Sequence, residues 1–149
     1  DVDGADVALT ALPYGTGPQR RSAVSVTLDV DGTPLRVASV HLQHRTGSID
    51  TRLEQIATFL DAEPVDGPRL VAGDLNAEPG WPEVALFEAA GLTSAVDEVG
   101  DPLSSTYPSV APSARIDWIF GAGVSFSDVG VLDVRQSDHR PLVATVSLP

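Results

Sequence analysis

Residues 24 to 42 constrain the fold of this 149-residue chain more than any other segment, because they carry a strong signal for a β-hairpin. From Val24 to Val30 every second residue is apolar and its neighbours are polar, which is typical of a half-buried strand. Asp31-Gly32 follows, a strong signal for a tight two-residue turn. The run from Leu35 to Leu42 then fits the returning strand, so the fold contains a sheet.

The rest of the chain mixes helices with further strands. Apolar residues at helical spacing from Ile49 to Leu60, after an N-cap at Ser48, predict an amphipathic helix. A second helix is expected from Pro82, a preferred first residue, to Gly91, a preferred C-terminal cap. Strands are expected at Leu70–Gly73, Arg115–Phe120, Val124–Val134 and Leu142–Leu148. The first twenty residues show only an apolar run, Val7–Leu12, before a loop at 13–19. The class is therefore α/β or α+β, with helices packed outside sheets.

Composition fits one globular domain spanning residues 1–149. Apolar residues make up 42% of the chain and charged residues 20%. The chain has no cysteine, which excludes disulfides, thiolate metal sites and cysteine nucleophiles. The net charge of −12 disfavours unspecific binding to duplex DNA. No apolar run approaches the roughly 20 residues of a transmembrane helix, and nothing in the sequence indicates a compartment.

Polar residues stand where predicted strands stop, and strand ends are where a rigid sheet can hold catalytic side chains. The four segments are His41 after Val40, Asp74-Leu75-Asn76 after Gly73, Asp117 within Arg115–Trp118, and Asp138-His139 before Arg140-Pro141.

Asp117 is the most informative of these residues. Ile116, Trp118 and Phe120 alternate on one strand face, so Asp117 points to the other. A carboxylate between large apolar residues needs a partner. Backbone donors or Arg115 satisfy it in a structural interpretation, and the imidazole of His139 satisfies it in a functional one.

The other segments also allow two interpretations. His41 is either a strand-end histidine with a satisfied hydrogen bond or a functional group. Gly73–Asn76 is either an ordinary turn or a carboxylate and an amide that share one face of an extended backbone and reach one phosphate together. Asp138-His139 is a weak signal by itself, because adjacent Asp and His residues occur by chance on many surfaces.

Together the segments are similar to the signature motifs of the endonuclease/exonuclease/phosphatase superfamily, in the family's order, over about Arg20 to Pro149. The motifs are Val40-His41-Leu42, Gly73-Asp74-Leu75-Asn76, Arg115-Ile116-Asp117-Trp118-Ile119-Phe120 and Ser137-Asp138-His139-Arg140-Pro141, with Thr106-Tyr107-Pro108 also family-like. The resemblance implies a two-sheet β-sandwich flanked by helices, with the site at one end of the sheets. It also implies Mg²⁺ or Mn²⁺ as cofactor, and hydrolysis of a phosphodiester or phosphomonoester by in-line attack of water.

The resemblance also implies a role for each matching residue. Asp138 resembles a metal-ligand carboxylate, and Asp117 the partner that orients and stabilises protonated His139. Asp74 resembles the group that positions or deprotonates the attacking water. Asn76 resembles a donor to the phosphate, and His41 resembles a further donor to a phosphoryl oxygen. Whether Asp74 or His139 is the general base stays open at this point.

The chain departs from the family pattern in its N-terminal part. Family members carry an asparagine on the first strand and a metal-binding glutamate in a Gln-Glu segment before the histidine strand. All six glutamates here follow His41, and none follows a glutamine. We therefore expect an N-terminally truncated version, the C-terminal part of the domain, whose site is completed by a partner chain or by a missing N-terminal segment.

Two functions are consistent with this pattern. The first is a metal-dependent phosphoesterase whose isolated chain is weakly active or inactive. The alternative is a non-catalytic interaction domain, or an inactive fragment, that retains the fold. The acidic composition favours a small molecule or a lipid head group as the phosphate-ester substrate over duplex DNA.

Overall fold

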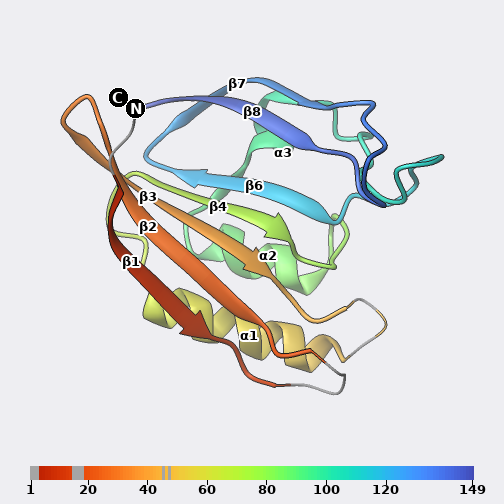
Figure 1. The fold of residues 1–149 in the computed structure, drawn as a ribbon, viewed down its shortest axis with the longest axis horizontal. Coiled ribbons are helices and arrows are strands. Elements are labelled where there is room, and N and C mark those ends of the chain that lie inside the picture. The colour runs from red at the N-terminus through yellow and green to blue at the C-terminus, as the bar shows by residue number, and fades with distance from the viewer. Residues whose placement is uncertain (1–3, 15–18, 45, 47) are drawn as a thin grey trace.

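The computed structural model describes residues 4–14, 19–44, 46 and 48–149 of the chain. The strands and helices of this part are β1 (Gly4–Ala11), β2 (Ser22–Val30), β3 (Thr33–His41), α1 (Ile49–Ala62), β4 (Arg69–Asp74), α2 (Pro82–Ala89), β5 (Thr93–Ser94), α3 (Ala95–Val99), β6 (Asp117–Ala122), β7 (Ser125–Val131) and β8 (Leu142–Ser147). They form a six-stranded sheet in the order β1-β2-β3-β4-β6-β5 and a two-stranded sheet of β7 and β8 (Figure 1). The predicted α+β class with two sheets and flanking helices is confirmed.

The β2–β3 hairpin forms where the alternating pattern predicts it. Asp31 and Gly32 both have positive φ, 51° and 83°, as a two-residue turn that follows the strand twist requires. The Asp29 carboxylate supports the turn by accepting a hydrogen bond of 2.7 Å from the Gly32 N–H. Val30 pairs with Thr33, and this register continues to Ala23 opposite Val40. The end of β3 therefore lies beside the start of β2.

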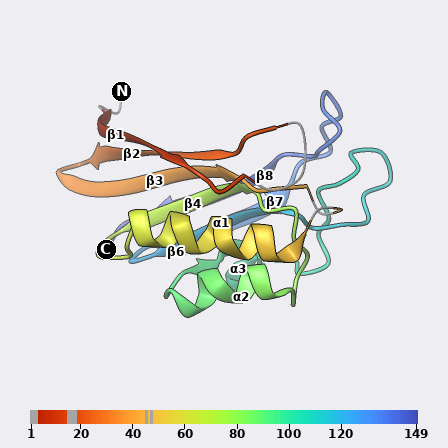
Figure 2. The ribbon, with the colours of Figure 1, turned by 90° about the horizontal axis from the view of Figure 1, so that it is seen from below.

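Strand β4 is the centre of the large sheet. It runs parallel to β3, reached through the crossover helix α1, and antiparallel to β6. Helices α1 and α2 lie side by side on one face of the sheet (Figure 2). The core between them and the sheet contains Val40, Ile56, Phe59, Val71, Val84, Phe87, Trp118 and Phe120, all less than 4% exposed. None of the described helices is both long and apolar enough to cross a membrane.

Three local features differ from the sequence expectations. The apolar run Val7–Leu12, which we did not assign to a strand, lies largely within β1. The segment 93–99, which has no clear pattern, forms the short β5 and α3. Ser48 is the N-cap of α1 as predicted, but its side chain makes no capping hydrogen bond. Residues 15–18 of the expected loop at 13–19 lie outside the described residues.

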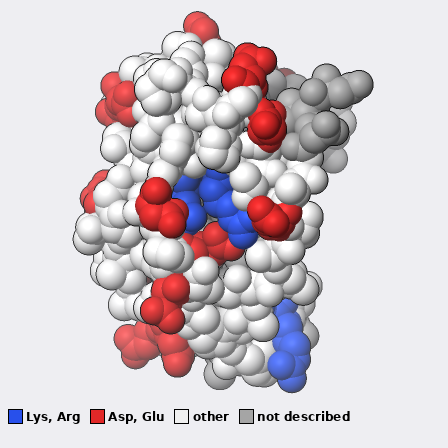
Figure 3. Space-filling view, turned by 90° about the vertical axis from the view of Figure 1, so that its left-hand side faces the viewer, with Lys and Arg blue, Asp and Glu red and all other residues white. Residues whose placement is uncertain are grey.

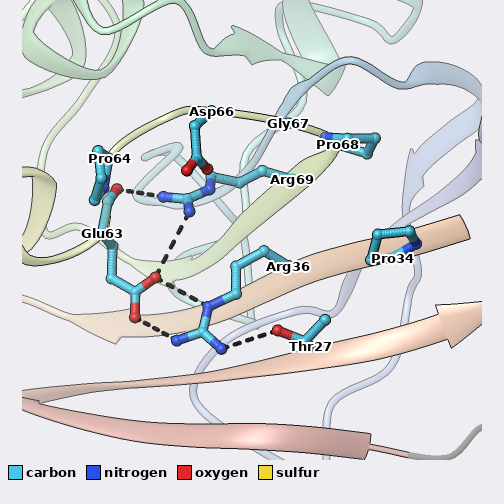
Figure 4. Close-up of a pocket in the computed structure, with 9 residues that line it drawn as sticks. All are labelled: Thr27, Pro34, Arg36, Glu63, Pro64, Asp66, Gly67, Pro68 and Arg69. Atoms are coloured by element: carbon cyan, nitrogen blue, oxygen red, sulfur yellow. Dashed lines mark hydrogen bonds and ion pairs between the residues drawn. The ribbon is translucent and has the colours of Figure 1, made fainter.

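An ion-pair cluster closes the end of the sheet where β3 and β4 begin. Arg36 and Arg69 are directly opposite each other on these strands. Glu63, which follows α1, accepts hydrogen bonds of 3.0 and 2.6 Å from Arg36 Nε and Nη2, and its Oε2 lies 3.6 Å from Arg69 Nη2 (Figure 4). Basic side chains lie in a hollow at this end of the molecule, with acidic side chains around them (Figure 3). Because Glu63 neutralises two like charges, we interpret the cluster as a structural clamp between α1 and the sheet.

Candidate active site

Three of the residues expected at the site form one row across the large sheet. His41 at the end of β3 pairs with Asp74 at the end of β4, and Asp74 pairs with Asp117 at the start of β6. The row therefore results from strand register alone and lies at the opposite end of the sheet from the Arg36–Glu63–Arg69 clamp. This end also holds the connections that follow β4 and precede β6 and β8 (Figure 1).

A close approach of the backbone allows this row to form. Gly73 has φ +146°, and a Cβ atom added there would lie 1.9 Å from the Val40 carbonyl oxygen. No side chain fits this position, so the glycine lets β4 pack against β3 immediately before Asp74. The Gly-Asp-Leu-Asn motif is thus more than an ordinary turn, since its glycine and Asp74 belong to the strand itself.

Asp117 and His139 form a hydrogen-bonded pair. Nδ1 of His139 lies 2.7 Å from Oδ2 of Asp117, and both side chains are about three-quarters buried. Arg115, the alternative partner for Asp117, instead pairs with Asp97 at 2.8 Å. Burial by itself lowers the pKa of His139, but the hydrogen bond and charge of Asp117, with the charges of Asp74 and Asp138, outweigh burial and raise it. The pair therefore favours the imidazolium form of His139.

The loop that carries His139 is fixed by the family-like Thr106-Tyr107-Pro108 segment. The Arg140 N–H donates to the Thr106 carbonyl at 2.7 Å, and the Ser109 N–H donates to the Asp138 carbonyl at 2.7 Å. The Tyr107 ring lies against the imidazole of His139, with ring centroids 4.9 Å apart. Backbone bonds on both sides and one ring contact thus set the position of the imidazole, which sequence spacing alone does not reveal.

Asn76 holds the carboxylate of Asp74. The backbone N–H of Asn76 donates to Asp74 Oδ1 at 2.7 Å, and its side-chain amide donates to Oδ2 at 3.1 Å. Asn76 is 2% exposed and has φ +52°, a conformation that asparagine tolerates better than most residues. In this arrangement Asn76 positions Asp74. Its expected contact with a substrate phosphate stays a prediction.

His41 and Asp74 are in contact, with Nε2 of His41 3.3 Å from Oδ2 of Asp74. Burial lowers the pKa of His41, and the charge of Arg21 lowers it further, although Asp74 opposes both. Burial also raises the pKa of Asp74, against the hydrogen bond from Asn76. Each partner is shifted towards its neutral form, so proton transfer at this pair is easier than between the same groups in water.

All these groups meet at one pocket of about 180 Å³. Its lining includes the five predicted residues His41, Asp74, Asn76, Asp138 and His139, while Asp117 lies behind His139 and lines an adjoining hollow. The lining also includes four residues that the sequence interpretation did not assign to the site: Arg21, His44, Tyr107 and Ile116. His44 is exposed and also lines the pocket.

The donor set fits the hard divalent cation that the family resemblance implies. Asp74, Asp117 and His139 bring ligand atoms within 4.8 Å of one another. An ion held by Asp117 and His139 would have to replace their 2.7 Å hydrogen bond, so these two are poor candidates. Asp138 is exposed at the pocket, and its carboxylate receives a hydrogen bond only from Ser137 Oγ among the described residues, at 3.1 Å. A carboxylate oxygen such as that of Asp138 is the type of ligand that Mg²⁺ and Mn²⁺ prefer.

Comparison with known proteins identifies the family that this chain matches. The model of the endonuclease/exonuclease/phosphatase family matches residues 3–139. The uncharacterized protein YbhP of Escherichia coli K12 is 32% identical over 124 residues, which cover 78% of this chain and 48% of YbhP. A protein of Yersinia enterocolitica is 31% identical over 115 residues, or 43% of its length. The chain thus spans about half the length of the curated relatives it matches.

Solved structures agree with this comparison at the level of the fold. The mannosyl-6-phosphatase Bt3783 of Bacteroides thetaiotaomicron superimposes with a TM-score of 0.83 at 17% identity, over 99% of this chain and 67% of that one. The human Nocturnin catalytic domain, solved with a bound sulfate anion, gives 0.81 at 24% identity, over 99% and 60%. The family match, the curated relatives and the strand-end row of His41, Asp74 and Asp117 agree, and the chain belongs to the endonuclease/exonuclease/phosphatase family.

Proposed function

We propose that this chain carries the catalytic half of a Mg²⁺- or Mn²⁺-dependent hydrolase that cleaves a phosphate ester by in-line attack of water. The observation that carries the proposal is the Asp117–His139 pair at 2.7 Å beside the Asp74–Asn76 pair, around one pocket. The fully buried ion pair Arg52–Glu83, by contrast, joins α1 to α2. The Asp117–His139 pair instead presents a charged imidazole to a solvent-accessible pocket.

Each residue has a role that follows from its surroundings. His139, kept cationic by Asp117, stabilises negative charge that develops on a phosphoryl oxygen. Asp74 has a raised pKa and a fixed orientation, so it suits the general base that takes a proton from the attacking water. His41 donates to a second phosphoryl oxygen. A divalent ion held by Asp138 would supply further neutralisation of the phosphate charge.

The test is hydrolysis of bis(p-nitrophenyl) phosphate with Mg²⁺ or Mn²⁺, with EDTA, and by the variant His139→Ala. Asp61→Asn, an exposed carboxylate on α1, is the matched control for Asp138→Asn. We expect turnover that needs the metal, is lost in the His139 and Asp138 variants, and is unchanged in the control. A protein that binds neither metal nor phosphate, and turns over nothing, would instead support the non-catalytic interaction domain.

We further propose that a carboxylate from outside these 149 residues, on another segment or a partner chain, completes the metal shell. Mg²⁺ is held by few protein carboxylates, so each one matters. The metal-binding glutamate that the family pattern has before the histidine strand is absent from these 149 residues. We expect weak turnover by the 149 residues alone and stronger turnover when the completing segment is supplied. Robust, EDTA-sensitive turnover by the isolated chain contradicts this second proposal and leaves the first in place.

The substrate we propose is a small phosphate ester or a phosphorylated head group. The pocket of about 180 Å³ is smaller than the roughly 300–1,000 Å³ of sites that enclose a whole drug-sized ligand, so it suits the phosphate group alone. The net charge of −12 disfavours a long polyanion such as duplex DNA. Competition by duplex DNA in the low-micromolar range at physiological salt would count against this choice.

A further inference from the structure

Arg21 differs from the other described arginines in the partners of its side chain. The chain has nine arginines and no lysine. Six of the eight described arginines pair with a carboxylate: Arg36, Arg52, Arg69, Arg115, Arg135 and Arg140. Arg20 lies over the Tyr14 ring, 5.3 Å from its centroid. Within the described part of the chain, the Arg21 side chain has neither an ion pair nor a hydrogen bond, although the protein carries 21 carboxylate residues.

The hairpin register explains where this arginine lies. Arg21 directly precedes β2, and Ala23 of β2 pairs with Val40 of β3. Continuing that register by two residues brings Arg21 opposite Leu42, next to His41. The Arg21 carbonyl accepts a hydrogen bond of 3.0 Å from the Leu12 N–H, so its backbone is tied to the end of β1. Its side chain is half-buried and lines the same pocket as Asp74 and His139.

Partial burial is energetically unfavourable for a guanidinium that has no hydrogen-bond partner. The Nε atom of Arg21 is shielded from solvent and has no hydrogen-bond partner among the described residues. A buried donor without a partner loses free energy relative to water, and a charged one loses more. An anion that enters the pocket would recover this loss. A guanidinium matches two oxygens of a phosphate better than any other side chain does, because its donors form a rigid planar fork.

We propose that Arg21 binds the non-bridging oxygens of the substrate phosphate and favours a doubly charged terminal phosphate over a phosphodiester. This inference rests on the proposed function. The preference follows from charge, because a phosphomonoester dianion gains about twice the Coulomb attraction to one guanidinium that a diester monoanion gains. Asp74 and Asp138, which line the same pocket, repel the dianion more strongly, so its binding depends more on Arg21.

The experiment compares Arg21→Gln with Arg20→Gln, a neighbouring change that removes the same charge outside the pocket. Binding of inorganic phosphate to the 149-residue chain is measured by titration calorimetry. The kcat and KM values for p-nitrophenyl phosphate and bis(p-nitrophenyl) phosphate are measured with Mg²⁺. Arg21→Lys tests whether charge without the fork is enough. Unfolding curves for all variants confirm that they are folded.

We expect Arg21→Gln to weaken phosphate binding about 10- to 100-fold, as is typical for the loss of a charged hydrogen bond. The KM for the monoester should rise more than the KM for the diester. Arg21→Lys should recover part of the binding, and Arg20→Gln should match the wild type within about twofold.

The outcomes separate the two proposals. Equal phosphate binding by the Arg21→Gln and Arg20→Gln proteins, or no phosphate binding by the wild type, overturns the role of Arg21. Turnover that is metal-dependent but insensitive to Arg21→Gln overturns it as well and leaves the proposed function intact. Phosphate binding that depends on Arg21 without any turnover supports the phosphate site and counts against hydrolysis by this chain.

Discussion

At the scale of single residues, Asp117 links the sheet to the loop that carries His139. It starts β6, and it holds the imidazole of His139 from a different part of the chain. Asparagine at this position keeps the shape and the acceptor oxygen but loses the charge that favours the imidazolium form. We expect Asp117→Asn to lower kcat by about 100- to 1,000-fold, the usual loss when one group that stabilises developing charge is impaired.

The unfolding free energy of Asp117→Asn should change by only about 1 kcal/mol, because the hydrogen bond is retained in neutral form. Steady-state kinetics and denaturant unfolding measure the two effects separately, and Asp61→Asn serves as the exposed control. Full activity in Asp117→Asn would show that the pair is structural rather than catalytic.

Glu63 makes the opposite kind of contribution, to stability rather than to the site. The bidentate hydrogen bond from Arg36, with the charges of Arg36 and Arg69, lowers the pKa of Glu63 in spite of its burial. A lowered folded-state pKa stabilises the protein above the unfolded-state pKa of about 4.3, and this stability is lost as pH falls through the folded value.

We therefore expect Glu63→Gln to cost about 3 kcal/mol at neutral pH, since it leaves Arg69 buried without a full counter-charge. The cost should shrink as the pH falls from the unfolded-state pKa towards the lowered folded-state pKa of Glu63, below which the wild-type carboxyl is itself protonated. Urea unfolding at several pH values measures this. If the unfolding free energies of the wild type and Glu63→Gln changed with pH in parallel, Glu63 would not be the stabilising carboxylate that we infer.

Two glycines show how differently backbone freedom matters at the scale of elements. Gly32 sits in the β2–β3 turn with φ +83°, and a Cβ atom there would meet nothing within 4 Å. We expect Gly32→Ala to cost about 1 kcal/mol, the strain of a positive φ alone. The control Gly67→Ala, also in open space but without the positive φ, should have a smaller effect.

Gly73→Ala should have a much larger effect, because its Cβ would overlap the Val40 carbonyl in the neighbouring strand. Pushing β4 away from β3 breaks the row of His41, Asp74 and Asp117, so we expect failure to fold or loss of activity with a loosened sheet. Thermal unfolding and near-ultraviolet circular dichroism measure this. A Gly73→Ala protein as stable as Gly32→Ala would show that the strands adjust without cost.

At the scale of the whole molecule, the large sheet has one face covered by helices and one face largely open. Leu9 on β1 pairs with Val24 on β2, and the two side chains are 75% and 45% exposed. Strand β1 is also an edge of the sheet in the described chain. Exposed apolar side chains on an unpaired edge favour association with another strand or chain.

We expect the 149-residue chain to self-associate as its concentration rises, and Leu9→Lys to reduce this association. Sedimentation velocity over a range of concentrations measures the effect. Leu103→Lys is the matched control, because Leu103 is 86% exposed but lies outside the sheet. A chain that stays monomeric at high concentration would show that the open face is tolerated.

The sequence by itself determined most of the elements and the candidate residues, but not β1, β5 or α3. Alternation and the Asp31-Gly32 turn predicted β2 and β3, and helical spacing predicted α1, because these signals are local and come from backbone geometry and side-chain period. The motifs at strand ends identified the six residues whose side chains gather at one end of the sheet. The two-residue turn also sets the register that brings Arg21 beside His41.

Only the tertiary structure decided what these residues contact. Sequence spacing left Arg115 and His139 as alternative partners for Asp117, and the loop held by Thr106 and Ser109 selects His139. The tertiary structure also shows that Asn76 orients Asp74. It shows as well that the Arg21 guanidinium has no carboxylate partner in the described chain. Apart from Asn76 and Asp74, which are two positions apart, these relations join residues at least 22 positions apart. A local pattern has no information on them, because the packing of strands and loops, not the spacing in the chain, sets which charges meet.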